Sequence, residues 1–201
     1  MHESIVLTEA KYSHLESLST IVARSFHPVN AYIKKVWPDT EGVRDYWSTL
    51  FRNELDSPSA HLLVLVKEGS NDVLGVLALR LMAEDERGSG MWRENNIAAD
   101  MDVNAYLPMV QSMTICRERY MLGQKHFLIQ LFGVDDELKG SGLGKMLLSR
   151  ACEIAAQAGH ELFVQANGYA KGFYQKHGFL LRDTVVMPGD DGYTEYMMVR
   201  S

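Results

Sequence analysis

Three glycines between a predicted strand and a predicted helix restrict the possible folds more than any other segment of the chain. Residues 134–145 read Val-Asp-Asp-Glu-Leu-Lys-Gly-Ser-Gly-Leu-Gly-Lys, with glycines at positions 140, 142 and 144. Glycines at alternate positions leave backbone N–H groups uncovered, so several of them can converge on one point. At the N-terminus of a helix this arrangement binds phosphate, and Lys139 and Lys145 add positive charge at its rim.

Two other kinds of glycine-rich loop fit this spacing poorly. A P-loop has four residues between its first Gly and its Gly-Lys pair, and Ser or Thr follows. Here three residues separate Gly140 from Gly144, and Met146 follows Lys145. A dinucleotide-binding loop has Gly-x-Gly-x-x-Gly in an early βαβ unit, whereas Gly-x-Gly-x-Gly occurs here two thirds of the way along the chain. The alternative that these glycines only form a turn that lets a helix pack on a sheet stays open at this point.

Hydrophobic periodicity predicts strands and helices along the whole chain. Strands are predicted at residues 5–7, 62–67, 73–82, 127–134, 162–166, 179–187 and 193–199. Helices are predicted at residues 15–26, 40–55, 104–122 (with Pro108 as an alternative start), 142–158 and 169–176, and a turn at 188–192. Residues 83–102 are predicted as a long loop, which in a compact domain is either functional or disordered. No repeat or linker divides the chain, so residues 1–201 are expected to form a single domain.

Composition and charge exclude several classes of partner. The formal net charge of −6 argues against nonspecific nucleic-acid binding, which relies on a basic surface. The longest apolar runs, such as residues 62–66, are too short to span a bilayer, and residues 1–4 do not begin a signal peptide. Cys116 and Cys152 are predicted as two buried thiols without a disulfide or metal-site pattern. A cytoplasmic protein with no metal, no membrane association and no nucleic-acid partner is expected.

The glycine-rich segment resembles the main motif of the GNAT superfamily of acyl-CoA N-acyltransferases. That motif has Arg or Gln, two residues, Gly, any residue, and then Gly or Ala, after a strand that ends in Val. Lys139, Gly142 and Gly144 occupy these positions, with Val134 at the end of the strand. Lys139 departs from the usual Arg or Gln. In the family that side chain is secondary to the backbone amides, so the departure is mild.

A second motif supports the resemblance, because Asn167, Ala170, Phe173-Tyr174 and Gly178-Phe179 follow in the family's order and spacing. The two motifs cover about residues 126–180. The resemblance implies a single-domain GNAT fold of the α/β (α+β) class. Its central, mixed but mostly antiparallel twisted sheet would have about seven strands, with helices on both faces. A V-shaped splay would separate two parallel strands, and the helix at 104–122 looks like an insertion.

The resemblance also implies a reaction, in which a primary amine attacks acetyl-CoA, the co-substrate, directly. A small-molecule acceptor is expected. A protein or peptide acceptor, a noncatalytic acyl-CoA-binding or sensing protein, and a homodimer all remain open. The residues implied to bind acetyl-CoA are Phe132, Gly133, Val134, Lys139, Gly140, Ser141, Gly142, Leu143, Gly144, Lys145, Asn167, Phe173 and Tyr174.

Acid–base chemistry is only partly assigned by the resemblance. Tyr174 lies at the family's general-acid position, and a phenol can protonate a leaving thiolate. The positions often used for the general base are Leu128 and Gln130, and neither side chain titrates. His126 is a weak candidate that would act through water, although a lone His is more often structural. Outside candidates from the predicted loop are Glu84, Asp100 and Asp102.

The sequence gives weaker indications of the residues that would bind the acceptor. Phe26, Tyr32, Trp37 and Trp47 are candidate walls of an acceptor pocket, although aromatic residues at helical spacing are more often core. The acidic stretch at residues 84–86 could attract a cationic amine, but a solvated charge run is the more common explanation of such a stretch.

Overall fold

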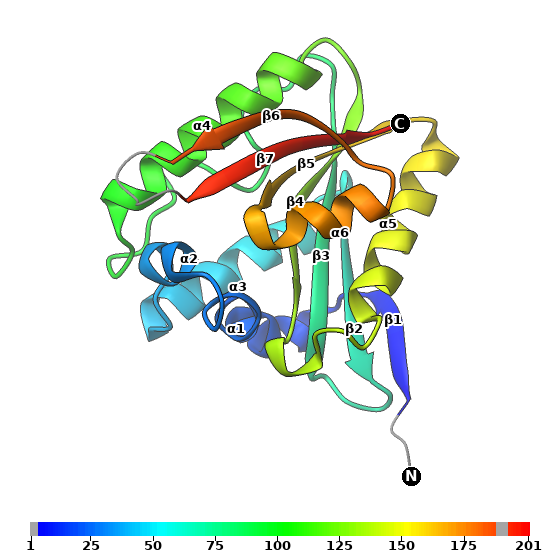
Figure 1. Ribbon diagram of the computed structural model, residues 1–201. Coiled ribbons are helices and arrows are strands. Elements are labelled where there is room, and N and C mark those ends of the chain that lie inside the picture. Colours follow the sequence, from blue (N-terminus) through cyan, green and yellow to red (C-terminus); the bar gives the residue numbers. More distant parts are fainter. Residues whose placement is uncertain (1–3, 188–192) are drawn as a thin grey trace.

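The structure, a computed structural model, describes residues 4–187 and 193–201 (Figure 1). Residues 1–3 and the predicted turn at 188–192 lie outside the described residues. The strands are β1 (Ile5–Glu9), β2 (Ala60–Lys67), β3 (Val73–Met82), β4 (His126–Val134), β5 (Glu161–Asn167), β6 (Leu180–Val186) and β7 (Thr194–Arg200). They form one sheet in the order β1-β2-β3-β4-β5-β7-β6. All neighbours are antiparallel except β4 and β5, which confirms the predicted mixed sheet.

Helices cover both faces of this sheet. Within the described residues they are α1 (Leu15–Phe26), α2 (Ala31–Val36), α3 (Glu41–Leu55), α4 (Val103–Met121), α5 (Leu143–Ala158) and α6 (Gly168–Lys176). Two short 3-10 turns, η1 (Tyr12–His14) and η2 (Asp136–Leu138), precede α1 and α5. In Figure 1, α5 and α6 lie in front of the sheet, and α1 and α3 lie behind it. None of the described helices combines the length and the apolar character needed to cross a bilayer.

The core follows from the two-residue period of the strands. In β2, Leu62, Val64 and Val66 pack towards α1 and α3, whereas Leu63 and Leu65 pack towards α5. Both sets are buried because helices cover both faces of the sheet. The central strands are therefore apolar at consecutive positions, which is why they were predictable as short apolar runs.

One helix was missed by the prediction, and one of the two starts predicted for another helix is wrong. The short helix α2 was not predicted, because six residues give less than two turns of periodicity. Its N-cap is Asn30, whose side chain accepts a hydrogen bond from the Ile33 N–H at 3.0 Å. The helix α4 begins at Val103, so Pro108 lies inside it rather than at its start.

The strands β4 and β5 separate halfway along their length. Their parallel ladder runs from His126–Glu161 to Ile129–Val164 and ends there. A β-bulge in β4 begins at the same point, because Ile129 and Leu131 pair with consecutive residues of β3 and leave Gln130 as the extra residue. A bulge increases local twist and bends the strand. The predicted splay is thus confirmed, and it opens at the carboxyl ends of β4 and β5.

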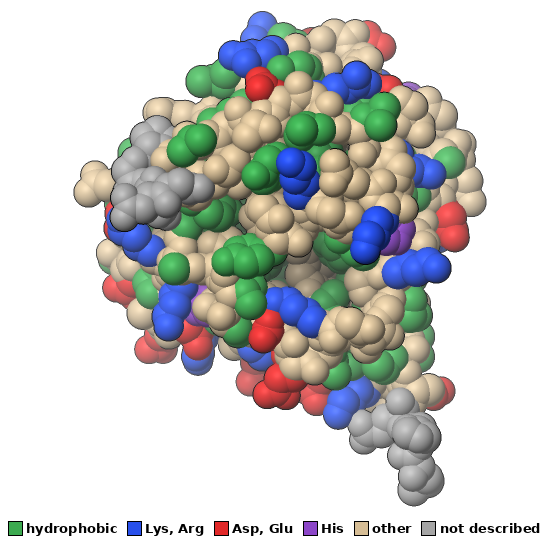
Figure 2. All heavy atoms as spheres, in the orientation of Figure 1, with side chains coloured by type: hydrophobic (Ala, Val, Ile, Leu, Met, Phe, Trp, Pro, Cys, Tyr) green, Lys and Arg blue, Asp and Glu red, His purple; other side chains and the backbone are tan. Residues whose placement is uncertain are grey.

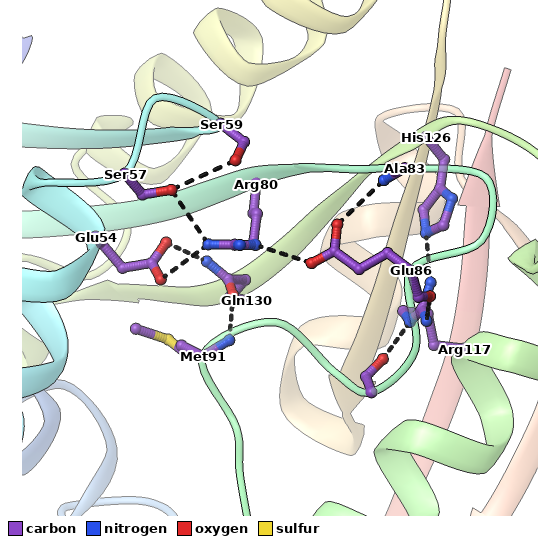
Figure 3. A network of polar contacts seen from close by, with 11 residues as sticks. Glu54, Ser57, Ser59, Arg80, Ala83, Glu86, Met91, Arg117, His126 and Gln130 are labelled. Atoms are coloured by element: carbon purple, nitrogen blue, oxygen red, sulfur yellow. Dashed lines mark hydrogen bonds and ion pairs between the residues drawn. The ribbon is translucent and has the colours of Figure 1, made fainter.

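The long loop 83–102 is fixed to the fold by Arg117 of α4, a fully buried side chain. Its guanidinium donates hydrogen bonds to the backbone oxygens of Glu86 and Gly88 (Figure 3). The loop in turn buries Met91 and Trp92. It is therefore part of the core next to the splay.

Candidate active site

A groove of about 530 Å³ lies between the end of α1, the second half of β4, the glycine-rich loop and α6. Figure 2 shows it as a hollow beneath α6, in the orientation of Figure 1. The residues that line it are Ser25, Phe26, Val29, Phe132, Gly133, Val134, Leu138, Lys139, Gly140, Gly142, Leu143, Gly144, Lys145, Asn167, Tyr169, Ala170 and Phe173. The groove thus brings together the predicted acetyl-CoA residues except Ser141 and Tyr174.

The glycine-rich loop leaves the N-terminus of α5 uncapped by any side chain. Gly140 and Gly142 have φ angles of 82° and 88°, and an added Cβ at either position would meet nothing within 4 Å. Glycine is therefore needed here for its backbone conformation. Gly142 is the N-cap and has no side chain to bond the first N–H groups of α5. The first N–H groups of α5 and the positive end of the helix dipole therefore favour the binding of an anion at this loop.

Two polar side chains of this loop are already engaged. The Lys139 ammonium pairs with the carboxylate of Asp136, and its side chain is 43% exposed. The Ser141 hydroxyl donates to the Leu138 carbonyl oxygen at 2.5 Å and so tightens the turn. At this loop the backbone amides are therefore more available to an anion than the Lys139 side chain is.

Ser25 of α1 provides an unpaired hydroxyl in the groove wall. Its Oγ is buried and has no hydrogen-bond partner within residues 4–187 and 193–201. A Cβ on Gly133 would lie 2.9 Å from that oxygen, so glycine at position 133 allows α1 to approach β4. Ser25 was not predicted as a site residue. A signal existed, because it falls on the buried stripe of α1 with Leu18, Ile21 and Val22.

A second cavity, of about 110 Å³, lies within the splay. It shares four wall residues with the groove, namely Phe26, Phe132, Asn167 and Ala170. Its apolar walls include Ile33, Trp37, Trp92, Met109 and Met113, and its polar groups include Gln130, Gln165, Tyr174, Tyr193 and Glu195. The groove and this splay cavity therefore meet at common side chains.

Tyr174 of α6 lines the splay cavity and is only 2% exposed. Its ring packs against Phe179, Phe173 and Phe132 at centroid distances of 5.1, 5.8 and 6.1 Å. Burial, with a smaller effect of Cys152, raises the pKa of the Tyr174 phenol. The hydroxyl is therefore protonated at neutral pH and can act as a donor.

Asn167 stands where β5 ends and α6 begins. Its Oδ1 accepts a hydrogen bond from the Ala170 N–H at 3.0 Å, which makes it the N-cap of α6. This bond fixes the side chain at the wall shared by the groove and the splay cavity. The Nδ2 group forms no hydrogen bond among the described residues and can donate to a ligand.

The structure does not bring His126 to either cavity. This side chain is fully buried at the closed end of the β4–β5 pair. Its Nδ1 lies 2.9 Å from the Gln124 carbonyl oxygen, and its Nε2 lies 3.5 Å from Nη1 of Arg117 (Figure 3). Burial lowers the pKa of His126, and the charge of Arg117 lowers it further. Glu84, Asp100 and Asp102 do not line the cavities either, and Asp102 caps α4.

The two positions often used for a base hold structural side chains. Leu128 is buried in the core between the sheet and α4. Gln130 donates from Nε2 to Oε2 of Glu54 at 2.6 Å and accepts from the Met91 N–H at 2.5 Å (Figure 3). Glu54 is 4% exposed, and burial raises the pKa of its carboxyl. Gln130 thus connects the bulge of β4 to α3 and to the long loop.

Glu195 of β7 is a carboxylate of the splay cavity that was not predicted. It is 6% exposed and accepts a hydrogen bond from the Gln165 amide, and the Tyr193 hydroxyl lies near it. Burial raises the pKa of Glu195 to about 7, although the Gln165 amide and the Tyr193 hydroxyl act in the opposite direction. A sequence signal existed, because Glu195 shares the face of Met197 and Val199, which are both buried.

The four aromatic candidates divide between the cavity and the core. Phe26 and Trp37 line the splay cavity. Tyr32 stacks on Tyr193, with ring centroids 4.3 Å apart, and so supports a residue of that cavity. Trp47 is 2% exposed in the core and does not line it.

The two cysteines are both free thiols. Burial raises the pKa of Cys116 and that of Cys152. In the part of the chain that the structure describes, no group of three His, Cys, Asp or Glu side chains could hold a metal ion.

Solved structures with the same fold include several N-acetyltransferases. A mosquito arylalkylamine N-acetyltransferase-like protein, 5b, matches with a TM-score of 0.69 and 15% identity over 98% of this chain and 99% of that one. A mutant agmatine N-acetyltransferase in its apo form matches with a TM-score of 0.68 and 15% identity over 97% of this chain and 98% of that one. A PaiA N-acetyltransferase of Thermoplasma acidophilum in complex with coenzyme A matches with a TM-score of 0.60 and 15% identity over 98% and 99%.

The sequence comparison gives the family. No curated protein matches the chain by sequence. The sequence model of the acetyltransferase (GNAT) family, however, matches residues 26–179, which is most of the chain and includes both motifs. This protein therefore belongs to the GNAT family of acetyltransferases.

Proposed function

We propose that this protein transfers the acetyl group of acetyl-CoA to the primary amine of a small, largely apolar molecule. One observation carries the proposal. The groove at the glycine-rich loop and the splay cavity share Phe26, Phe132, Asn167 and Ala170. A long donor anchored at the loop would therefore present its thioester end at the cavity where an amine can bind.

The groove suits the donor in size and chemistry. Its volume of about 530 Å³ is within the range of ligand pockets. The uncapped start of α5 would take the pyrophosphate, with Lys145 beside it. The backbone of residues 132–134, next to the open splay, would hydrogen-bond the pantetheine arm. Ser25 offers to the same arm a hydroxyl that has no hydrogen-bond partner in the described part of the chain.

The splay cavity suits a compact acceptor. Its volume of about 110 Å³ is smaller than the roughly 150 Å³ of a cavity that holds benzene. Trp37, Trp92, Met109 and Met113 make its walls apolar. A small amine with an apolar body fits these walls better than a peptide chain does. The arylalkylamine N-acetyltransferase-like protein and the agmatine N-acetyltransferase among the structural neighbours support a small amine as acceptor.

The chemistry requires no covalent bond to the protein. The amine nitrogen would attack the thioester carbonyl directly, and holding both reactants at the shared wall would supply much of the rate. Backbone N–H groups of the splayed half of β4 would stabilise negative charge on the carbonyl oxygen. Tyr174 would protonate the leaving sulfur, because its hydroxyl is protonated and lines the cavity.

Thermal unfolding with nucleotide ligands tests the donor. A ligand that binds only the folded state stabilises it, by about 2.7 kcal/mol when present at a hundred times its Kd. Acetyl-CoA is expected to raise the melting temperature, whereas NAD and ATP at equal concentration are not. No shift with saturating acetyl-CoA would refute the donor assignment.

Thiol release with a panel of amines tests the acceptor. The panel contains isobutylamine, agmatine and a short peptide with a free N-terminus. The splay cavity predicts the highest kcat/KM for isobutylamine, because the cavity is small and its walls are apolar. Turnover of the peptide alone would indicate a protein acetyltransferase. Background rates with every amine, despite acetyl-CoA binding, would indicate an acyl-CoA-binding protein.

A further inference from the structure

Glu195 lines the splay cavity near the wall that this cavity shares with the groove. It lies on β7 opposite Asn167, the residue at the wall shared with the groove. Tyr174 lines the same cavity from α6. A carboxylate and a phenol from different elements thus border the space where the donor groove meets the acceptor side.

The partner of Glu195 has an unused acceptor. The Gln165 amide nitrogen donates to the Glu195 carboxylate, but Gln165 Oε1 is buried without a hydrogen-bond partner in the described part of the chain. Buried polar atoms are nearly always paired, so an unpaired one in a cavity wall points to a ligand. An ammonium group has three N–H donors. The Glu195 carboxylate and Gln165 Oε1 would accept two of them.

We propose, on the basis of the proposed function, that Glu195 is the general base that takes a proton from the acceptor ammonium. Gln165 is its positioning residue, since its amide hydrogen-bonds the Glu195 carboxylate. The assignment places acid and base on different elements, with Tyr174 on α6 and Glu195 on β7.

The surroundings of Glu195 favour this role. Its pKa of about 7 means that the carboxylate is ionised in a large fraction of molecules at neutral pH and still binds a proton well. Burial raises the pKa of Tyr193 and that of Cys116 of α4, so both neighbours are neutral. Asp183 of β6, which also acts on Cys116, is paired with Arg119 of α4. No lysine, arginine or histidine among the described residues forms an ion pair with Glu195.

Glu54 provides a matched comparison. It is also a buried glutamate, it also accepts a hydrogen bond from a glutamine, and burial also raises its pKa. It lines a different cavity, beside Arg80 and Asn53, and not the splay cavity. Gln130 stands between it and the splay. Glu54 therefore cannot take the proton directly.

Glu195 and Tyr174 together account for the protons that move in the proposed reaction. Glu195 takes one proton from the ammonium, and the nitrogen lone pair forms the C–N bond to the acetyl carbon. The C–S bond breaks, and its electron pair stays on sulfur. Tyr174 protonates the sulfur and then takes a second proton from the nitrogen. The third proton of the original ammonium stays on the nitrogen of the amide product. Glu195 then releases its proton to solvent.

The test compares Glu195→Gln with Glu54→Gln in the full chain, using the best amine of the panel. The pH dependence of kcat/KM is measured from about pH 5.5 to 9.5, and acetyl-CoA binding by thermal shift. Glu195→Gln is expected to lower kcat about a hundredfold. It should also remove the fall of kcat/KM at low pH, the acid limb of the profile. The rise in melting temperature with acetyl-CoA, the acetyl-CoA shift, should be retained. Glu54→Gln should retain both the rate and the acid limb.

A second variant tests the positioning. Gln165→Leu removes a hydrogen bond that lowers the pKa of Glu195, so the acid limb should move to higher pH, which a merely structural role would not cause. If the wild-type protein turns over an amine but the acid limb is unchanged in both Glu195→Gln and Gln165→Leu, the assignment of the base is overturned and the proposed function is not. Absence of wild-type turnover with every amine would overturn the proposed function and the base together.

Discussion

Gln130 Nε2 donates a hydrogen bond to Oε2 of Glu54 at 2.6 Å and thereby ties the bulge of β4 to the last turn of α3. The other end of the same amide accepts the Met91 N–H at 2.5 Å. Three elements that are distant in sequence are therefore joined at one side chain, beside the point where β4 and β5 separate (Figure 3). The amide therefore fixes the place where β4 and β5 separate.

Replacing this amide should destabilise the fold. Gln130→Leu would leave the Glu54 carboxylate and the Met91 N–H without their partner in a buried place, at a cost of about 2–3 kcal/mol. Urea unfolding measures the change. The control is Gln157→Leu on the exposed side of α5, expected to change stability by less than about 0.5 kcal/mol. Equal stabilities of the two variants would contradict the role of Gln130.

Gly142 should matter for donor binding more than for the fold. Its φ angle of 88° is strained for any residue with a Cβ, so Gly142→Ala should cost about 1–2 kcal/mol of stability. Relief of that strain would rotate the peptide groups at the start of α5. The thermal shift produced by acetyl-CoA is therefore expected to fall markedly.

Gly69 supplies the matched control, since it has a φ angle of 76° and open space at its Cβ in the turn between β2 and β3. Gly69→Ala should cost similar stability and leave the acetyl-CoA shift unchanged. A normal shift in Gly142→Ala would mean that the pyrophosphate does not bind at this loop.

The elements that the sequence predicted well are those with enough residues to show a period. The strands agree with prediction to within a few residues, because helices on both faces make them continuously apolar. The helix α2 was missed because six residues carry little periodicity. The burial of Trp92 depends on Arg117 holding a loop in place, which is a tertiary contact without a local signal.

The positions of Tyr174 at the splay cavity and of the glycine-rich loop at the groove were predictable from motif spacing, whereas the position of Glu195, the proposed base, was not. His126 begins β4, and a parallel pair that opens at its carboxyl end leaves such a residue at the closed end. Its position in the strand therefore argues against a role at the splay. Glu195 shows the reverse, because alternation in β7 placed a carboxylate on a buried face and no motif marked it.

Tyr174→Phe should separate binding from chemistry. The phenyl ring keeps the packing against Phe132, Phe173 and Phe179, so stability and the acetyl-CoA shift should change little. Loss of the proton donor should lower kcat about a hundredfold. The control is Tyr46→Phe, a buried tyrosine whose pKa burial also raises, but which lines neither cavity. An unchanged kcat in Tyr174→Phe would mean that the thiolate leaves without this acid.

Glu195 should also make folding stability depend on pH. Its pKa is about 7 in the folded protein and 4.5 as the ordinary glutamate value expected for the unfolded chain. Between pH 4.5 and about 7, Glu195 holds a proton in the folded state that it has released in the unfolded chain. The stability from this proton is therefore fully present below pH 4.5 and is lost as the pH rises through about 7.

Glu195→Gln should remove this dependence, because an amide does not titrate. Relative to the variant, the wild type should lose on the order of 3 kcal/mol of unfolding free energy between pH 4.5 and 7. Urea unfolding of both proteins across this range, without acetyl-CoA, measures the difference. Since all other groups titrate equally in the two proteins, parallel curves would show that Glu195 has an ordinary pKa and is not a base poised near neutrality.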